Sequence, residues 1–125
     1  MAKLRTETPI VFVDFHAEVT SEKIALGWLL DGKVSAIVGT HTHVQTADER
    51  ILPQGTACLT DAGFTGGHGG VLGREWPPIV ERFLRQTPQR FNVCETDVKL
   101  HGCVIEIDDE TGRARSIERV SEVLK

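Results

Sequence analysis

The sequence has no block of lysines or arginines, no long apolar run and no signal-peptide pattern. A formal net charge of −4 without basic blocks provides no electrostatic footprint for nucleic acid and no basic face for an anionic membrane. No apolar run is long enough to span a bilayer. We therefore expect a cytoplasmic protein that binds a small molecule, and neither a nucleic-acid duplex nor a membrane.

Paired cysteine motifs are absent as well. Cys58, Cys94 and Cys103 are odd in number and form no C-x-x-C pair. They are predicted to be reduced, mostly buried thiols, which argues against a disulfide framework or a zinc knuckle. The 125 residues are enough to bury a core, and residues 1–125 are interpreted as a single domain.

The first forty residues have the pattern of a β-α-β unit. The apolar, β-branched run at 9–15 predicts a parallel strand buried on both faces, and the run at 34–40 predicts a second strand. Between them, Thr20 is a candidate N-cap of a helix, and Gly32 is a candidate stop. Such a unit places the carboxyl ends of its two parallel strands at one edge of the sheet.

Three histidines follow these strand ends. His16 leaves the first strand, and His41 and His43 leave the second, after Gly39, which lets the backbone approach closely. Three converging imidazoles suit Zn, Fe, Mn or Co better than Mg or Ca. We expect a metal site here; the alternative is that each histidine makes only local hydrogen bonds.

Carboxylates near these histidines are candidates for orienting the imidazoles. They are Asp14, Glu18 and Asp48. For Glu18 and Asp48 taken singly, helix capping or solvation is the alternative.

The second half of the chain contains a glycine-rich loop between two structured regions. Residues 49–61 predict a hairpin around Pro53–Gly55, and residues 63–73 contain six glycines without a P-loop or a dinucleotide fingerprint. This loop either contacts phosphate through its backbone or is a mobile surface loop. His68 within it is expected to be exposed, either solvated or reaching a ligand.

The remaining segments predict a helix and an antiparallel hairpin. The run at 76–86 begins with prolines suited to a first helical turn and has an apolar stripe, which predicts a packing helix. Alternating residues from 91 to 120, with a turn at 108–112, predict antiparallel strands. His101 in the first of these strands is interpreted as structural. The fold class is α/β, a layered mixed sheet that starts parallel and ends antiparallel.

The stretches D-F-H-A-E, T-S-E-K and G-T-H-T-H-V-Q-T-A-D-E, in this order and spacing, closely resemble the carboxyl-terminal half of the YmdB-type bacterial metallophosphoesterases of the calcineurin-like superfamily. The resemblance continues from Pro9 nearly to the end of the chain. It implies a metallophosphoesterase-type fold, present in part, and hydrolysis of 2′,3′-cyclic nucleotides or other phosphodiesters.

The resemblance also implies roles for particular residues. His16, His41 and His43 correspond to histidine ligands of a centre that holds two divalent metals such as Mn, Fe or Zn. Residues 65–73 correspond to a segment near the substrate, which implies a substrate-binding role for Thr65, Gly66, Gly67 and His68. The G-G-H-G-G stretch departs from the family pattern there, which puts a ligand role for His68 in question.

The motifs of the family's amino-terminal half are missing from this sequence. Those motifs are a strand-end Asp, a Glu-Asn pair and an Asn-His pair, whereas the single asparagine here, Asn92, precedes Val93. We expect a carboxyl-terminal fragment that holds at most one metal well, supplies no complete set of catalytic residues and hydrolyses phosphoesters weakly or not at all. We also expect a homo-oligomer or association with the missing half; the alternatives are a non-catalytic metal-binding or interaction module, and one part of a split enzyme.

Overall fold

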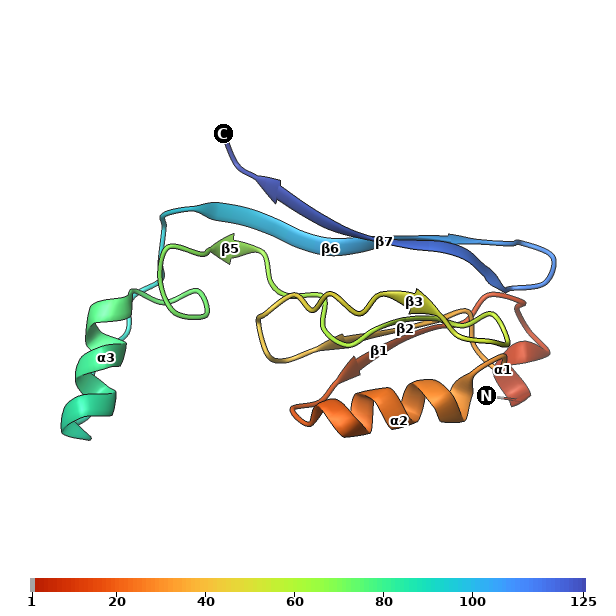
Figure 1. Ribbon diagram of the computed structural model, residues 1–125, viewed down its shortest axis with the longest axis horizontal. Coiled ribbons are helices and arrows are strands. Elements are labelled where there is room, and N and C mark those ends of the chain that lie inside the picture. Colours follow the sequence, from red (N-terminus) through yellow and green to blue (C-terminus); the bar gives the residue numbers. More distant parts are fainter. Residues whose placement is uncertain (1) are drawn as a thin grey trace.

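The computed structural model describes residues 2–125 and arranges them in three layers (Figure 1). After the short helix α1 (Ala2–Arg5), the predicted β-α-β unit is present as β1 (Phe12–His16), α2 (Thr20–Leu30) and β2 (Ala36–Thr40). The other elements are β3 (Arg50–Ile51), β4 (Ala57–Leu59), β5 (Gly66–Gly67), α3 (Trp76–Arg85), β6 (Val98–Ile107) and β7 (Ala114–Val123). The mixed α/β class is confirmed.

The first sheet has the strand order β1-β2-β4-β3. Strands β1, β2 and β4 are parallel, and β3 pairs antiparallel with β4 across the predicted turn at Pro53–Gly55. Strand β2 lies inside the sheet and is almost entirely buried, which agrees with its continuous apolar run. The parallel start of the fold is therefore confirmed.

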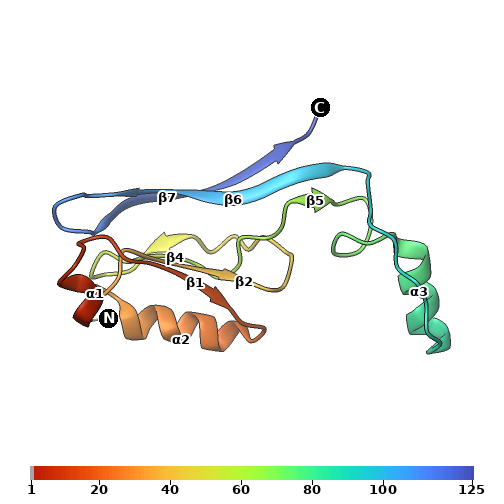
Figure 2. The same ribbon diagram turned by 180° about the vertical axis from the view of Figure 1, so that it is seen from behind.

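The antiparallel part forms a separate sheet of order β5-β6-β7. Strands β6 and β7 are joined by the predicted turn, where Gly112 adopts a φ of 67°. Ala114 of β7 packs against Ala36 and Ala57 of the first sheet, and these small side chains let the two sheets approach closely. Helix α2 lies on the other face of the first sheet (Figures 1 and 2).

Two expectations for the β-α-β unit are wrong in detail. Strand β1 is an edge strand with alternating exposure, and Phe12 is 55% exposed, because no second strand lies beyond β1 in the described chain. Helix α2 starts at Thr20 itself, with Val19 in the cap position and no side-chain cap. The helix buries Lys23 and Gly27 against the sheet.

Helix α3 extends away from the two sheets (Figure 2). Prolines occupy its first turn as predicted, but of its apolar stripe only Ile79 is buried, while Phe83 and Leu84 are 77% and 75% exposed. The prediction of a packing helix is therefore wrong for this chain, because no element of residues 2–125 covers the stripe. Across the same residues, no helix is both long and apolar enough to cross a membrane.

Candidate functional site

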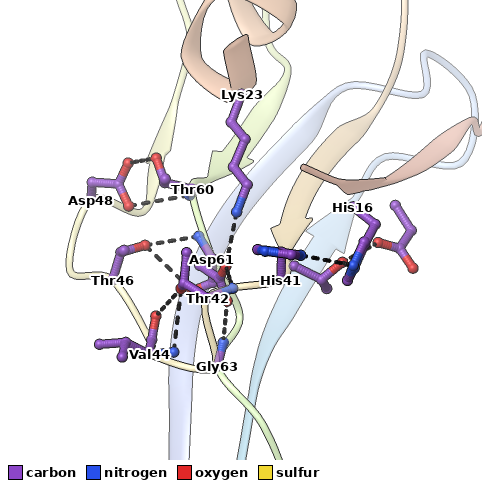
Figure 3. A network of polar contacts seen from close by, with 12 residues as sticks. His16, Lys23, His41, Thr42, Val44, Thr46, Asp48, Thr60, Asp61 and Gly63 are labelled. Atoms are coloured by element: carbon purple, nitrogen blue, oxygen red, sulfur yellow. Dashed lines mark hydrogen bonds and ion pairs between the residues drawn. The ribbon is translucent and has the colours of Figure 1, made fainter. Parts of the chain in front are cut away.

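His16 and His41 meet at the carboxyl edge of the parallel sheet (Figure 3). His16 is the last residue of β1 and pairs in register with Thr40, the last residue of β2, so His41 follows directly. The Nε2 atom of His16 lies 3.0 Å from Nδ1 of His41, and the ring centroids are 4.8 Å apart. Two imidazole ligands of a tetrahedral zinc ion have nitrogens about 3.3 Å apart, so a small ring movement brings this pair to that spacing.

A chain of hydrogen bonds orients His16. The Thr40 hydroxyl donates to Asp14 Oδ1 at 3.1 Å, and Nδ1 of His16 lies 3.1 Å from the same hydroxyl oxygen. Because an ionised carboxylate only accepts hydrogen bonds, the hydroxyl proton is committed to Asp14 and His16 donates its Nδ1–H. Nε2 of His16 therefore carries a lone pair, which accepts a hydrogen bond from Nδ1–H of His41. A metal bound by both nitrogens would replace this hydrogen bond and require the other tautomer of His41. Asp14 thus has the orienting position that the sequence suggested.

His43 lies apart from this pair. Its Nδ1 donates to the Leu72 carbonyl oxygen at 3.3 Å, and its ring stacks on Phe64 at a centroid distance of 5.4 Å. The structure therefore brings together two of the three predicted histidines. Within residues 2–125 no group of three or more His, Cys, Asp or Glu side chains is placed to hold a metal ion. A three-histidine ligand set stays a prediction.

The backbone of the histidine loop is strained. His41 has a φ of 123° and His43 a φ of 60°, values that residues other than glycine seldom adopt. Such conformations persist where surrounding contacts hold them, and they are concentrated at functional sites. Here the backbone N–H of Thr42, between the two histidines, donates to Asp61 Oδ2 at 2.9 Å.

Asp61 is the buried anchor of this loop. Its Oδ2 also accepts from Lys23 Nζ at 2.8 Å, and the side chains of Lys23 and Asp61 are 3% and 0% exposed. Oδ1 accepts from the Gly63 N–H at 2.9 Å. Burial raises the pKa of Asp61, but the hydrogen bonds from Lys23, Thr42 and Gly63 outweigh it and hold the pKa below its ordinary value.

Sequence reasoning missed the Lys23–Asp61 pair, because its members lie 38 residues apart. The one local signal was an aspartate at the end of the apolar run of β4. Asp48, which was a candidate for orienting an imidazole, instead binds the backbone N–H and the hydroxyl of Thr60. That interpretation of Asp48 is corrected, since its carboxylate holds the neighbouring loop.

Gly39 has the predicted role of allowing close approach. A Cβ atom at this position would lie 1.8 Å from the carbonyl oxygen of Thr60. Strand β2 can therefore run beside the end of β4 only with glycine here, and the Gly39 carbonyl accepts from the Ala62 N–H at 2.8 Å. The histidine loop and the Asp61 segment are held together by this contact.

The glycine-rich segment is anchored to the second sheet. Gly66 and Gly67 form β5, which pairs with β6, and a Cβ at Gly67 would lie 2.0 Å from the Cys94 carbonyl oxygen. These glycines thus serve close packing, and the expectation of a free surface loop is wrong. Thr65 is exposed, whereas His68 is half-buried and stacks on Phe64 at 4.3 Å, so its predicted exposure is also wrong.

A cavity of about 320 Å³ joins the histidine loop to this segment. His43, Phe64, His68 and His101 are among its lining residues. The ring centroid of His101 lies 4.4 Å from that of His68. The histidine that the sequence assigned a structural role therefore contacts a second imidazole. Gln45 also lines the cavity and links the loop to the β6–β7 hairpin, because its Nε2 donates to the carbonyls of Gly102 and Val120.

The geometry can be compared with known proteins. The family model described as YmdB-like protein matches residues 1–120. The chain belongs to the YmdB-like family. A relative from Bacillus subtilis named 2′,3′-cyclic-nucleotide 2′-phosphodiesterase is 56% identical over 120 residues, which are 96% of this chain and 46% of that protein. A putative phosphatase/phosphodiesterase of Mycoplasma genitalium is 39% identical over 97% of this chain and 43% of its own length.

Solved structures show the same YmdB-like fold. The crystal structure of a novel phosphatase from Mycoplasma pneumoniae superposes with a TM-score of 0.89 at 38% identity, covering 98% of this chain and 44% of that one. A hypothetical protein from Thermus thermophilus has a TM-score of 0.87 at 39% identity and covers 98% and 48%. The chain therefore spans about half the length of these relatives, and its fold is part of theirs.

Proposed function

We propose that this chain provides the carboxyl-terminal part of a metal-dependent phosphodiesterase centre, with His16 and His41 as ligands of one divalent ion of Mn, Fe or Zn and His43 as a third ligand. The observation that carries the proposal is the His16–His41 pair, whose nitrogens lie 3.0 Å apart. The Asp14–Thr40 chain leaves Nε2 of His16 unprotonated, as a metal ligand requires. The printed names of the relatives support phosphoester hydrolysis, with a 2′,3′-cyclic nucleotide as the proposed substrate.

Each residue of the site has a defined task in this proposal. A bound divalent metal supplies Lewis acidity toward phosphoryl oxygens and lowers the pKa of a coordinated water. The chain itself orients His16 through Thr40 and holds the histidine loop through Asp61. Thr65, Gly66, Gly67 and His68 are the proposed substrate-binding segment, and His68 among them lines the cavity that His43 also lines.

We expect the isolated chain to hydrolyse phosphodiesters poorly. The family resemblance implies a complete site with two metals, whereas the described residues bring together only two histidines. Loss of a single well-placed stabilising group costs about 10²–10³ in rate, so loss of most of a metal shell leaves little above background. The proposed partner is therefore an amino-terminal half of a YmdB-like protein, as in a split enzyme.

The test compares the manganese- or iron-loaded chain alone with the same chain mixed with, or fused to, the amino-terminal half of a relative. Hydrolysis of 2′,3′-cyclic AMP is measured, with His43→Ala as the variant that removes a proposed ligand. Activity that needs both halves and falls in the variant supports the proposal. Robust turnover by the isolated chain, abolished by His43→Ala, would show that a complete site forms without the second half.

A second candidate function is a non-catalytic interaction module that works as a homo-oligomer. The observation that favours it is the uncovered stripe of α3, where Phe83 and Leu84 are 77% and 75% exposed. We expect a dimer or a larger assembly, and light scattering after gel filtration measures its mass. A concentration-independent mass of 13.8 kDa would exclude self-association. A Phe83→Asp/Leu84→Asp variant is expected to be monomeric.

A further inference from the structure

His68 and His101 form a second pair of facing imidazoles outside the proposed metal centre. His68 comes from the glycine-rich segment just after β5 and His101 from β6, and both line the same cavity. Their ring centroids are 4.4 Å apart and their planes are inclined by 58°. The His16–His41 pair has comparable values of 4.8 Å and 73°.

The protonation of His68 follows from its hydrogen bond. Its Nδ1 lies 2.9 Å from the Gly66 carbonyl oxygen, and because a carbonyl only accepts, Nδ1 carries the proton. In the neutral ring, Nε2 therefore holds the lone pair. A backbone carbonyl that fixes the tautomer in this way is a common support for a metal-ligating histidine.

Two ring nitrogens of this pair are buried without a hydrogen-bond partner among residues 2–125. They are Nε2 of His68 and Nδ1 of His101. A buried nitrogen without a hydrogen-bond partner destabilises the fold, and a group bound at this position would relieve both nitrogens. The backbone of Gly63 packs directly beside His101, because a Cβ there would lie 2.7 Å from its Nδ1.

We propose that His68 and His101 bind a divalent transition-metal ion of the zinc type, through Nε2 of His68 and Nδ1 of His101. Neutral imidazole nitrogens suit Zn²⁺, Ni²⁺ and Cu²⁺. No third His, Cys, Asp or Glu joins the pair within residues 2–125, so water completes the coordination shell and zinc remains exchangeable. The site is separate from the His16–His41 pair and does not depend on the proposed phosphodiesterase activity.

The experiment measures zinc binding by a variant that lacks the His16–His41 pair of the proposed catalytic centre. A His16→Ala/His41→Ala variant removes the first pair, and calorimetric titration with Zn²⁺ then reports on the remaining histidines. We expect one equivalent to bind. Adding His68→Ala or His101→Ala is expected to weaken binding by at least about tenfold, the lower end of the loss seen when even an outer-shell partner is removed. Adding His43→Ala tests whether that proposed ligand of the first centre contributes, and the loss caused by His68→Ala is expected to persist in its absence.

A second measurement needs no substitution at the pair. ¹⁵N NMR of the imidazole rings in the double variant follows each nitrogen during the zinc titration, with circular dichroism as the check on folding. We expect Nε2 of His68 and Nδ1 of His101 to shift together. The proposal is overturned if the double variant binds no zinc, if His68→Ala leaves the affinity unchanged, or if zinc shifts the His43 ring and not these two nitrogens.

Discussion

Replacing Asp61 by alanine tests whether the buried ion pair holds the histidine loop. The substitution leaves Lys23 Nζ without a partner at 3% exposure and also removes the acceptor of the Thr42 and Gly63 N–H groups. Removing one partner of a buried pair typically costs about 3–5 kcal/mol. Since unfolding entropy is about 2.1 cal/mol/K per residue, 125 residues convert that loss to a fall in Tm of roughly 11–19 °C.

The matched variant is Lys23→Met, which keeps the methylene volume and leaves Asp61 bound to both backbone N–H groups. We expect Lys23→Met to lower the free energy of unfolding by less than Asp61→Ala does. Lys23→Met leaves one buried carboxylate with part of its hydrogen bonds, whereas Asp61→Ala leaves three donors without an acceptor. Thermal unfolding by circular dichroism measures both variants. The reasoning is refuted if Asp61→Ala unfolds within about 2 °C of the parent, well below the expected fall, or if Lys23→Met proves the more damaging of the two.

The same pair predicts a pH dependence. The pKa of Asp61 is held below its ordinary value of 3.8, so its stabilisation is fully present above that value and is lost as pH falls toward the lower folded-state pKa. The parent should therefore lose stability in acid below about pH 4, and Asp61→Ala should lose less over that range. Equal acid sensitivity in the two proteins would assign the effect to other carboxylates.

Three further changes test separate parts of the site. Gly39→Ala places a Cβ 1.8 Å from the Thr60 carbonyl oxygen, and overpacking of this kind lowers the free energy of unfolding by about 1–3 kcal/mol or more. Urea unfolding measures this loss, and an unchanged midpoint would contradict the close contact. Thr40→Val breaks the hydrogen bond that orients His16 and should weaken metal binding by about 10–100-fold with little change in Tm. Thr40→Ser keeps the hydroxyl and should retain binding. If the valine variant binds metal as tightly as the parent, the tautomer argument is wrong. Burial raises the pKa of Cys58 from 9.0 to about 11, so alkylation at pH 8 should run about 100-fold slower than in the unfolded chain, and equal rates would show that the thiol is not shielded.

Local pattern was sufficient for the order and type of most elements. The apolar run of β2, the turn at 108–112 and the prolines at the start of α3 each have their cause within a few residues, so the sequence predicts them directly. The placement of His16 and His41 at one sheet edge also follows, because parallel strands joined by one helix end on the same side.

The tertiary structure decided which residues are exposed and which side chains contact one another. Strand β1 and helix α3 have apolar patterns that predict burial, yet their burial is decided by which elements lie beside them, and residues 2–125 contain none that cover the outer edge of β1 or the stripe of α3. The turning of His43 toward Leu72 likewise depends on a segment remote in sequence.

The sequence by itself determined the α/β class and the histidines available for chemistry, because the type of each element and the spacing of residues along the chain are local properties. Only the tertiary structure decided which side chains meet. Lys23 reaches Asp61, Thr40 connects Asp14 with His16, and His68 contacts His101 of β6 from the segment after β5. A hydrogen bond or an ion pair depends on distances of about 3 Å, which sequence spacing does not specify once the partners belong to different elements.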